Sequence, residues 1–211
     1  ELPEGWQWVE LGDVCDLQNG FAFKSKDYIN SSNTLNIRMS NIKPEGNFDL
    51  EYAQKFLPDS YADDYRQFLL KDGDLIIAMT DLAGDPKILG VPTLVRNGDG
   101  RNLLLNQRVG RLQNFSEKID VPWLRYVLST PMNKSYYKGK GGGGLQIKMS
   151  KSDVLSASIP LPTIKEQKYT ASEMEYKLAG VKLTEGSIQQ ELDTIEAMPS
   201  AILRKAFAGE L

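Results

Sequence analysis

Up to about Pro162 the chain alternates short apolar runs with turn-forming residues. The run Gly73–Thr80 (GDLIIAMT) follows a Lys-Asp-Gly turn and predicts a buried strand. Asn102–Asn114 is also typical of strands, because its apolar positions are interrupted by polar residues. In Thr34–Ile42 (TLNIRMSNI) apolar and polar residues alternate, which predicts a strand with one buried face.

Two segments combine such runs with helix-capping residues. Asp120–Thr130 (DVPWLRYVLST) predicts a helix, because Asp120 can cap it and Pro122 suits its first turn. We expect the next residue, Trp123, to begin an apolar face. Ser150–Pro162 (SKSDVLSASIPLP) predicts a capped turn followed by a short strand.

The pattern changes after Pro162, and a long helix is expected from roughly Lys165 to Ala197, on the order of 50 Å in length. Its positions three and four residues apart form the seam of a coiled coil. The seam comprises Gln167, Ala171, Met174, Leu178, Val181, Glu185, Ile188, Leu192 and Ile195. Pro199 is expected to break or kink this helix, so that Ser200–Phe207 forms a short terminal helix.

Such a helix requires a partner for its apolar stripe, either its own domain or another chain. The narrow seam and the charged opposite face favour another chain. Gly180 and Gly186 each weaken the helix by about 1 kcal/mol relative to alanine, which also favours external support. The pattern therefore predicts an α+β protein: a globular domain over residues 1–162, then a coiled-coil-type dimerisation or spacer helix over 163–211.

Composition narrows the function classes. The chain has 211 residues, 41 % hydrophobic and 25 % charged, which is ordinary for a globular protein. A net charge of −3 means that any nucleic-acid-binding surface must be local. The single cysteine excludes an intrachain disulfide and fits a reducing cytoplasm. No apolar run approaches the roughly 18 residues of a membrane span.

Candidate chemistry is sparse. The absence of histidine excludes Ser-His-Asp and Cys-His catalysis and histidine-ligated zinc. No phosphate-binding or cofactor-binding glycine motif is found, and Gly84–Ile88 (GDPKI) lacks the stacking aromatic residue of an adenine methyltransferase motif. The aspartates form no clear nuclease arrangement, so we interpret most of them as turn and surface residues.

Three polar clusters are better explained as a binding surface. Arginine and lysine can pair with guanine, asparagine and glutamine with adenine, and lysines with phosphates. The candidate DNA-binding residues are Arg38, Ser40, Asn41 and Lys43; Asn106, Gln107 and Arg108; and Lys138, Lys140, Gln146 and Lys148. The last set lies in a segment that we expect to be a flexible loop, Asn133–Asp153, which contains five lysines and four consecutive glycines, Gly141–Gly144. The alternative is that each cluster is an ordinary solvated face.

Several segments, in order along nearly the whole chain, resemble the DNA specificity subunit of type I restriction–modification systems. They are Leu2–Gly20 (LPEGWQWVELGDVCDLQNG), Gly73–Thr80, Leu105–Leu112 (LNQRVGRL), Ile159–Gln167 (IPLPTIKEQ) and Ala201–Leu211 (AILRKAFAGEL). The resemblance implies target-recognition domains, each followed by a long helix, with the helices paired antiparallel as a spacer. It also implies a chain without catalytic activity, in which each domain reads one half of a split DNA sequence.

The resemblance implies partners as well: double-stranded DNA, methyltransferase subunits that use S-adenosylmethionine, and a restriction subunit that uses ATP, all in the cytoplasm and away from membranes. This chain carries one recognition domain and one helix, so it resembles half of a typical subunit. We therefore expect a homodimer through the helix and a palindromic, interrupted target. The alternatives are a recognition scaffold without a restriction partner, or an enzyme with unrecognised carboxylate–metal chemistry.

Overall fold

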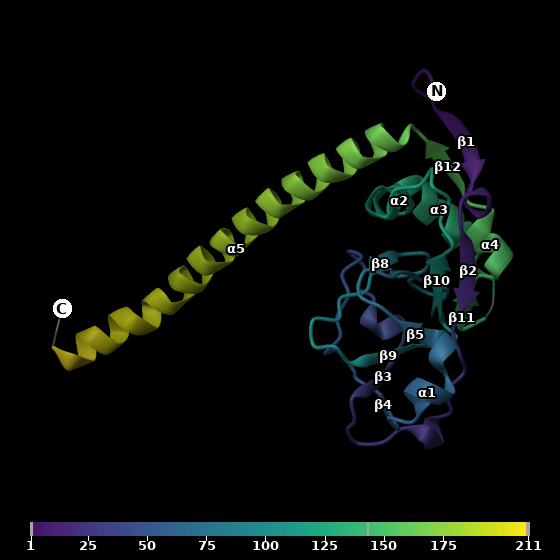
Figure 1. Ribbon diagram of the computed structural model, residues 1–211. Coiled ribbons are helices and arrows are strands. Elements are labelled where there is room, and N and C mark those ends of the chain that lie inside the picture. Colours follow the sequence, from purple (N-terminus) through teal and green to yellow (C-terminus); the bar gives the residue numbers. More distant parts are fainter. Residues whose placement is uncertain (1, 143, 210–211) are drawn as a thin grey trace. The chain divides into compact units, whose positions relative to one another are not determined.

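The computed structural model describes residues 2–142 and 144–209, which form two compact units (Figure 1). The first unit extends to Lys168 and the second begins at Tyr169. Gly143, from the glycine run, and Glu210 and Leu211, from the closing segment, lie outside the described residues.

Two four-stranded sheets form the centre of the first unit. One is antiparallel in the order β2-β10-β6-β8: β2 (Asp16–Asn19), β10 (Val109–Gln113), β6 (Leu75–Ala78) and β8 (Pro92–Leu94). The other has the order β4-β3-β9-β5, with β3 and β9 parallel: β4 (Phe56–Leu57), β3 (Thr34–Ile37), β9 (Asn102–Leu105) and β5 (Leu69–Leu70). Buried side chains from both sheets share a core cluster, while Leu57 of β4 and Leu104 of β9 belong to a second cluster with Phe23.

Two two-stranded ribbons, four α-helices and short 3₁₀ turns complete the described part of this unit. The ribbons pair β1 (Gln7–Glu10) with β12 (Ser158–Leu161), and β7 (Thr80–Leu82) with β11 (Gln146–Lys148). The helices are α1 (Tyr61–Asp64), α2 (Val121–Leu128), α3 (Pro131–Lys140) and α4 (Lys151–Leu155). Because β1 pairs with β12, the two ends of the unit are joined before the long helix begins.

Several predicted elements are confirmed. Every residue of β6 is buried, and Asn102–Asn114 contains the two strands β9 and β10. The Asp120 side chain caps α2 by accepting a hydrogen bond from the backbone N–H of Trp123 at 3.1 Å. Ser150 and Asp153 form the capping box at the start of α4. The caps and the strand depend on residues that are close together in the sequence, so the sequence pattern is sufficient to predict them.

Two parts of the prediction for Thr34–Ile42 are wrong, because the strand stops at Ile37 and has no exposed face. Strand β3 ends there, and a 3₁₀ turn over Met39–Asn41 follows. All four strand residues are buried, because β3 lies inside its sheet and both of its faces are covered. The polar Asn36 side chain is accommodated by donating to the Tyr28 hydroxyl at 2.8 Å.

The lysine-rich segment Asn133–Asp153, expected to be a flexible loop, instead contains regular secondary structure. Its first part is helix α3, in which Tyr137 is completely buried. The Tyr137 ring packs against Gly90, where a Cβ atom would lie 2.3 Å from the ring. Asn133, also buried, donates to the carbonyl of Val127 at 3.0 Å. Contacts distant in sequence therefore hold a segment that its glycines and lysines alone indicate to be flexible.

The second unit consists of helix α5 (Ile164–Ala208), which begins in the first unit. The separate terminal helix expected after Pro199 is not observed, because the helix is continuous through this proline. Proline removes one backbone donor, and the hydrogen bonds of the turns on either side can maintain the helix. Side chains from Ser172 to Gly209 are exposed. Among the described helices, none has the length and hydropathy needed to cross a lipid bilayer.

Candidate nucleic-acid interface

The first polar cluster, around the 3₁₀ turn after β3, is largely engaged within the fold. Asn41 is buried; its Oδ1 accepts from the backbone N–H of Arg38 at 2.9 Å, and its Nδ2 donates to the carbonyls of Asp49 and Tyr52 at 2.9 and 3.2 Å. The Arg38 Nη2 donates to a carbonyl in the next loop at 3.0 Å. Asn41, expected from the sequence to be a DNA-binding residue, therefore holds the loop together, and its amide is engaged by backbone groups.

Lys43, in the same cluster, is neutralised by its surroundings. Its Nζ lies 3.1 Å from Asp49 and 3.5 Å from the centroid of the Tyr52 ring. The hydrogen bond from Lys43 lowers the pKa of Asp49, so this carboxylate is ionised at neutral pH. The Oγ of Ser40 is buried and has no hydrogen-bond partner among the described residues. This cluster offers less free positive charge than its composition indicates.

The second cluster lies where the chain crosses from β9 to β10, and it divides into buried and available residues. Asn106 is buried, and its Oδ1 accepts from the backbone N–H of Arg108 at 3.1 Å. Gln107 is exposed and Arg108 is partly buried. Within the described chain, neither of these two side chains forms a hydrogen bond or an ion pair. They remain available to a ligand, whereas Asn106 shapes the turn that presents them.

The third cluster combines the end of α3 with strand β11. Lys138 and Lys140 lie in the last helical turn, and Lys148 lies in the strand; all three are exposed. Backbone hydrogen bonds in both directions between Gly142 and Lys148, at 3.2 and 2.9 Å, connect the helix end to the strand. Gln146 is partly buried in the same strand. The structure thus brings together residues that the sequence places on either side of the glycine run.

The start of α5 is fixed by a group of contacts within the first unit. Glu166 accepts from the N–H and Oγ1 of Thr163 at 2.9 and 2.7 Å and from the Trp6 indole at 3.3 Å. The hydrogen bonds from Thr163, followed by that from Trp6, lower the pKa of Glu166. These contacts form a capping box, which explains the Thr-x-x-Glu spacing at this junction.

Gln167, expected to belong to the helix seam, is fully buried in the first unit instead. Its Nε2 donates to the carbonyls of Lys118 and Pro162 at 2.7 and 3.0 Å, and its Oε1 accepts from the backbone N–H of Asp120 at 2.9 Å. Its amide thus satisfies three backbone groups around the helix start. An apolar seam residue would leave these groups without partners.

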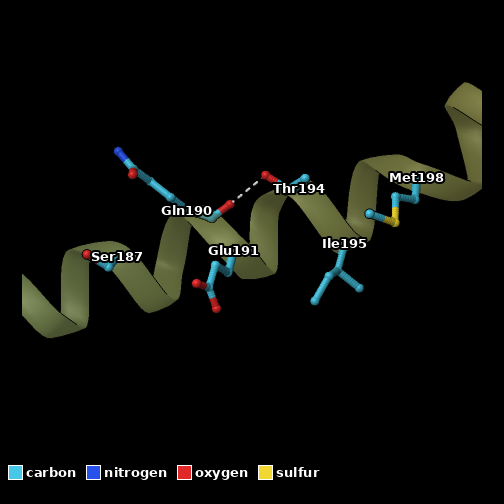
Figure 2. Close-up of a pocket in the computed structure, with 6 residues that line it drawn as sticks. All are labelled: Ser187, Gln190, Glu191, Thr194, Ile195 and Met198. Atoms are coloured by element: carbon cyan, nitrogen blue, oxygen red, sulfur yellow. Dashed lines mark hydrogen bonds between the residues drawn. The ribbon is translucent and has the colours of Figure 1, made fainter.

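Of the remaining apolar seam positions of the second unit, Ala171 is buried and the other six are exposed. They are Met174, Leu178, Val181, Ile188, Leu192 and Ile195. Figure 2 shows Glu191, Ile195 and Met198 on one side of the helix, while the Thr194 hydroxyl donates to the Gln190 carbonyl at 2.8 Å on another. The hollow beside these side chains is lined by α5 alone, so it is an open helix face and not an enclosed binding site.

Neither a metal-binding cluster nor an activated thiol is found in the part of the chain that the structure describes. No cluster of three or more histidine, cysteine or acidic residues there could hold a metal ion. Cys15 is buried, and burial, followed by the nearby Asp16 charge, raises the pKa of its thiol to about 12. A thiol with this pKa stays protonated at neutral pH and is a poor nucleophile.

Comparison with known proteins identifies a single family. A family model described as the type I restriction modification DNA specificity domain matches residues 3–194. The type I restriction enzyme MjaVIII specificity subunit of Methanocaldococcus jannaschii is 31 % identical over 214 residues, covering 100 % of this chain and 47 % of the relative. The EcoBI specificity subunit of Escherichia coli is 23 % identical, covering 100 % and 40 %. The chain thus spans about half the length of these curated relatives.

Solved structures show the same fold. The HsdS subunit from Thermoanaerobacter tengcongensis superposes with a TM-score of 0.59 at 24 % identity, covering 100 % of this chain and 47 % of that one. A chain from a type I R-M system, studied for complex assembly and conformational transition, gives a TM-score of 0.65 at 22 % identity, covering 100 % and 48 %. The arrangement of a mixed unit followed by a long helix is therefore shared with these proteins.

Proposed function

This chain belongs to the family of type I restriction modification DNA specificity domains, and we propose that it reads one half of a divided DNA sequence for a modification complex. It is a recognition component and not a catalytic one, as its relatives are specificity subunits. The observation that carries the proposal is the family match over residues 3–194, which includes both the recognition unit and most of the long helix.

The exposed residues of the second and third clusters support a DNA-binding role. Lys138, Lys140 and Lys148 are exposed and form no ion pair among the described residues, so they are available for phosphates. Gln107 and Arg108 present hydrogen-bonding groups that can pair with base edges. The overall charge of −3 is compatible with this role because these cations are gathered locally.

The exposed seam of α5 supports pairing with a second copy. One chain provides one apolar stripe, and two copies related by a twofold axis would cover both stripes in an antiparallel pair. Because twofold-related recognition units read the same half-site in opposite orientations, the target would be an interrupted palindrome. The pair of helices would set the spacing between the half-sites, for which one DNA turn of about 34 Å is the natural unit.

The paired chains would direct the catalytic subunits to DNA. The relatives' names, which describe restriction enzyme specificity subunits, support methyltransferase and restriction subunits as partners. S-adenosylmethionine and ATP would then be bound by those subunits, in the cytoplasm where the DNA lies. Methylation mapping in cells with and without this chain tests the proposal: a divided, symmetric motif should lose methylation when the chain is removed. An unchanged methylation pattern would contradict it.

A further inference from the structure

The β7–β11 ribbon is a two-stranded sheet of its own, and its position is held by backbone contacts. Gln146 pairs with Leu82, and Lys148 with Thr80, in an antiparallel register. The backbone N–H of Met149 donates to the Met79 carbonyl at 3.0 Å, and that of Ala83 donates to the Leu145 carbonyl at 3.1 Å. Strand β7 directly follows β6 of the central sheet, and β11, labelled in Figure 1, pairs with it.

One face of the ribbon is anchored in the first unit. Asp81 is buried, and its carboxylate accepts hydrogen bonds from the backbone N–H groups of Leu82, Ile88 and Leu89 at 2.7, 2.5 and 3.0 Å. Ile147, opposite Asp81, is buried as well. Gly141 packs so closely that a Cβ there would lie 2.9 Å from a Leu89 methyl group. The ribbon is thus presented in a preorganised conformation.

The outer part of the ribbon exposes two leucines that the core does not use. The Leu82 side chain is 59 % exposed and that of Leu145 is 93 % exposed. Both line a groove with a volume of about 590 Å³, together with Ile88 and Lys87. Asp85, an acid at this groove, is paired with the Lys87 Nζ at 3.2 Å. The groove therefore combines apolar contact with little uncompensated negative charge.

Charge complementarity indicates what this surface contacts. The exposed Lys148 lies on the ribbon itself, and the exposed Lys138 and Lys140 precede it on α3. The DNA major groove admits a two-stranded ribbon, and a thymine there presents a methyl group that apolar side chains recognise. Its paired adenine presents N7 and N6, which suit the glutamine amide of Gln146, directly opposite Leu82 in the register.

We propose that the β7–β11 ribbon enters the major groove of the half-site. There Leu82 and Leu145 recognise a thymine by contact with its 5-methyl group, and Gln146 contacts the adenine paired with that thymine. This inference rests on the proposed function and adds the reading element and the chemical group that is read. The leucines supply specificity for A·T pairs, while the neighbouring lysines hold the ribbon to the phosphates.

Deoxyuridine tests this directly, because it replaces thymine and removes only the 5-methyl group. The assembled modification complex would be titrated with duplexes of the mapped target in which each thymine is replaced in turn. We expect one replacement per half-site to weaken binding by about fourfold, the effect of one buried methyl group. Leu82→Ala and Leu145→Ala complexes should bind the thymine and deoxyuridine duplexes at that position equally. Ile29→Ala, which trims an exposed apolar side chain elsewhere, should retain the fourfold difference.

The outcomes separate this inference from the proposed function. Specific binding without any deoxyuridine effect would overturn the methyl contact and leave the recognition role intact, as would a mapped half-site without thymine. A leucine variant that weakens binding but keeps the fourfold difference would show that its side chain contacts something other than the methyl group, and would also overturn the inference. A complex without any sequence preference would refute both.

Discussion

Replacing Leu178 and Leu192 by aspartate should separate the two copies that α5 is proposed to join. These side chains are 41 % and 47 % exposed in the single chain. Full burial of a leucine contributes about 1.5–3 kcal/mol, so covering the exposed part contributes about 1 kcal/mol for each side chain. Two leucines in each of two copies therefore amount to about 4 kcal/mol, roughly a thousandfold in the dissociation constant.

The introduced carboxylates should increase this effect, because a charge facing an apolar seam loses hydration without gaining a partner. The mass of the purified chain would be measured by light scattering or sedimentation over a range of concentrations, and methylation by the complex in parallel. We expect a monomer that no longer supports methylation of the divided target.

Leu183→Asp is the matched control, since this leucine lies on the same helix outside the seam and is 78 % exposed. It introduces the same charge into α5 and should leave the dimer intact. A wild-type chain that is monomeric while its complex is active would refute the pairing of two copies through α5. A double variant that remains dimeric, or a control that dissociates as readily as the double variant, would equally refute this pairing.

Four further predictions concern the recognition unit. Replacing the three lysines of the third cluster by alanine should weaken DNA binding across all sequences and reduce the salt dependence by about 0.9 per lost phosphate contact; an unchanged slope would place them away from DNA. Gln167→Leu should lower the free energy of unfolding by about 3 kcal/mol in denaturant titrations, because three buried backbone groups lose their partner, whereas Lys168→Ala should have little effect. Gly90→Ala should lower the free energy of unfolding by about 3 kcal/mol, because the φ of +72° is strained for alanine and the new methyl group would overlap the Tyr137 ring. Gly98→Ala, where no atom is close, should be nearly neutral, and thermal unfolding would measure both variants. The pKa of Glu166 is lowered in the folded chain, so its stabilising contribution should be present above its ordinary pKa of 4.5 and be lost as the pH falls below that value. Glu166→Gln should remove this part of the pH dependence of thermal stability. An unchanged pH profile would argue against the capping box.

The polar clusters show how far residue type alone can predict a binding surface. Asn41 and Asn106 have the side chains that read adenine, yet both are buried and bonded to the backbone. Gln107 and Arg108 adjoin one of them and are available. Asparagine satisfies buried turns as well as base edges, and the sequence carries no signal that separates these roles. Leu82 and Leu145 present the opposite case, because apolar residues in short runs are normally expected in a core.

Local features were determined by the sequence itself. The cap at Asp120, the box at Ser150 and the run that forms β6 depend on residues within a few positions, and the spacing of α5 reflects a helical repeat. The order of segments that identifies the family is likewise a property of the chain. Each of these requires only neighbours in sequence, so a linear pattern contains the necessary information.

Tertiary structure alone decided which side chains are left free. Tyr137 is buried because Gly90 leaves room for its ring, and Gln167 is buried because backbone groups near Lys118 and Asp120 require its amide. These pairs are separated by about 47 residues along the chain, and neither partner indicates the other in the sequence. Burial depends on the summed contacts of such distant segments, so the exposed surface emerged only when the sheets and helices were packed together.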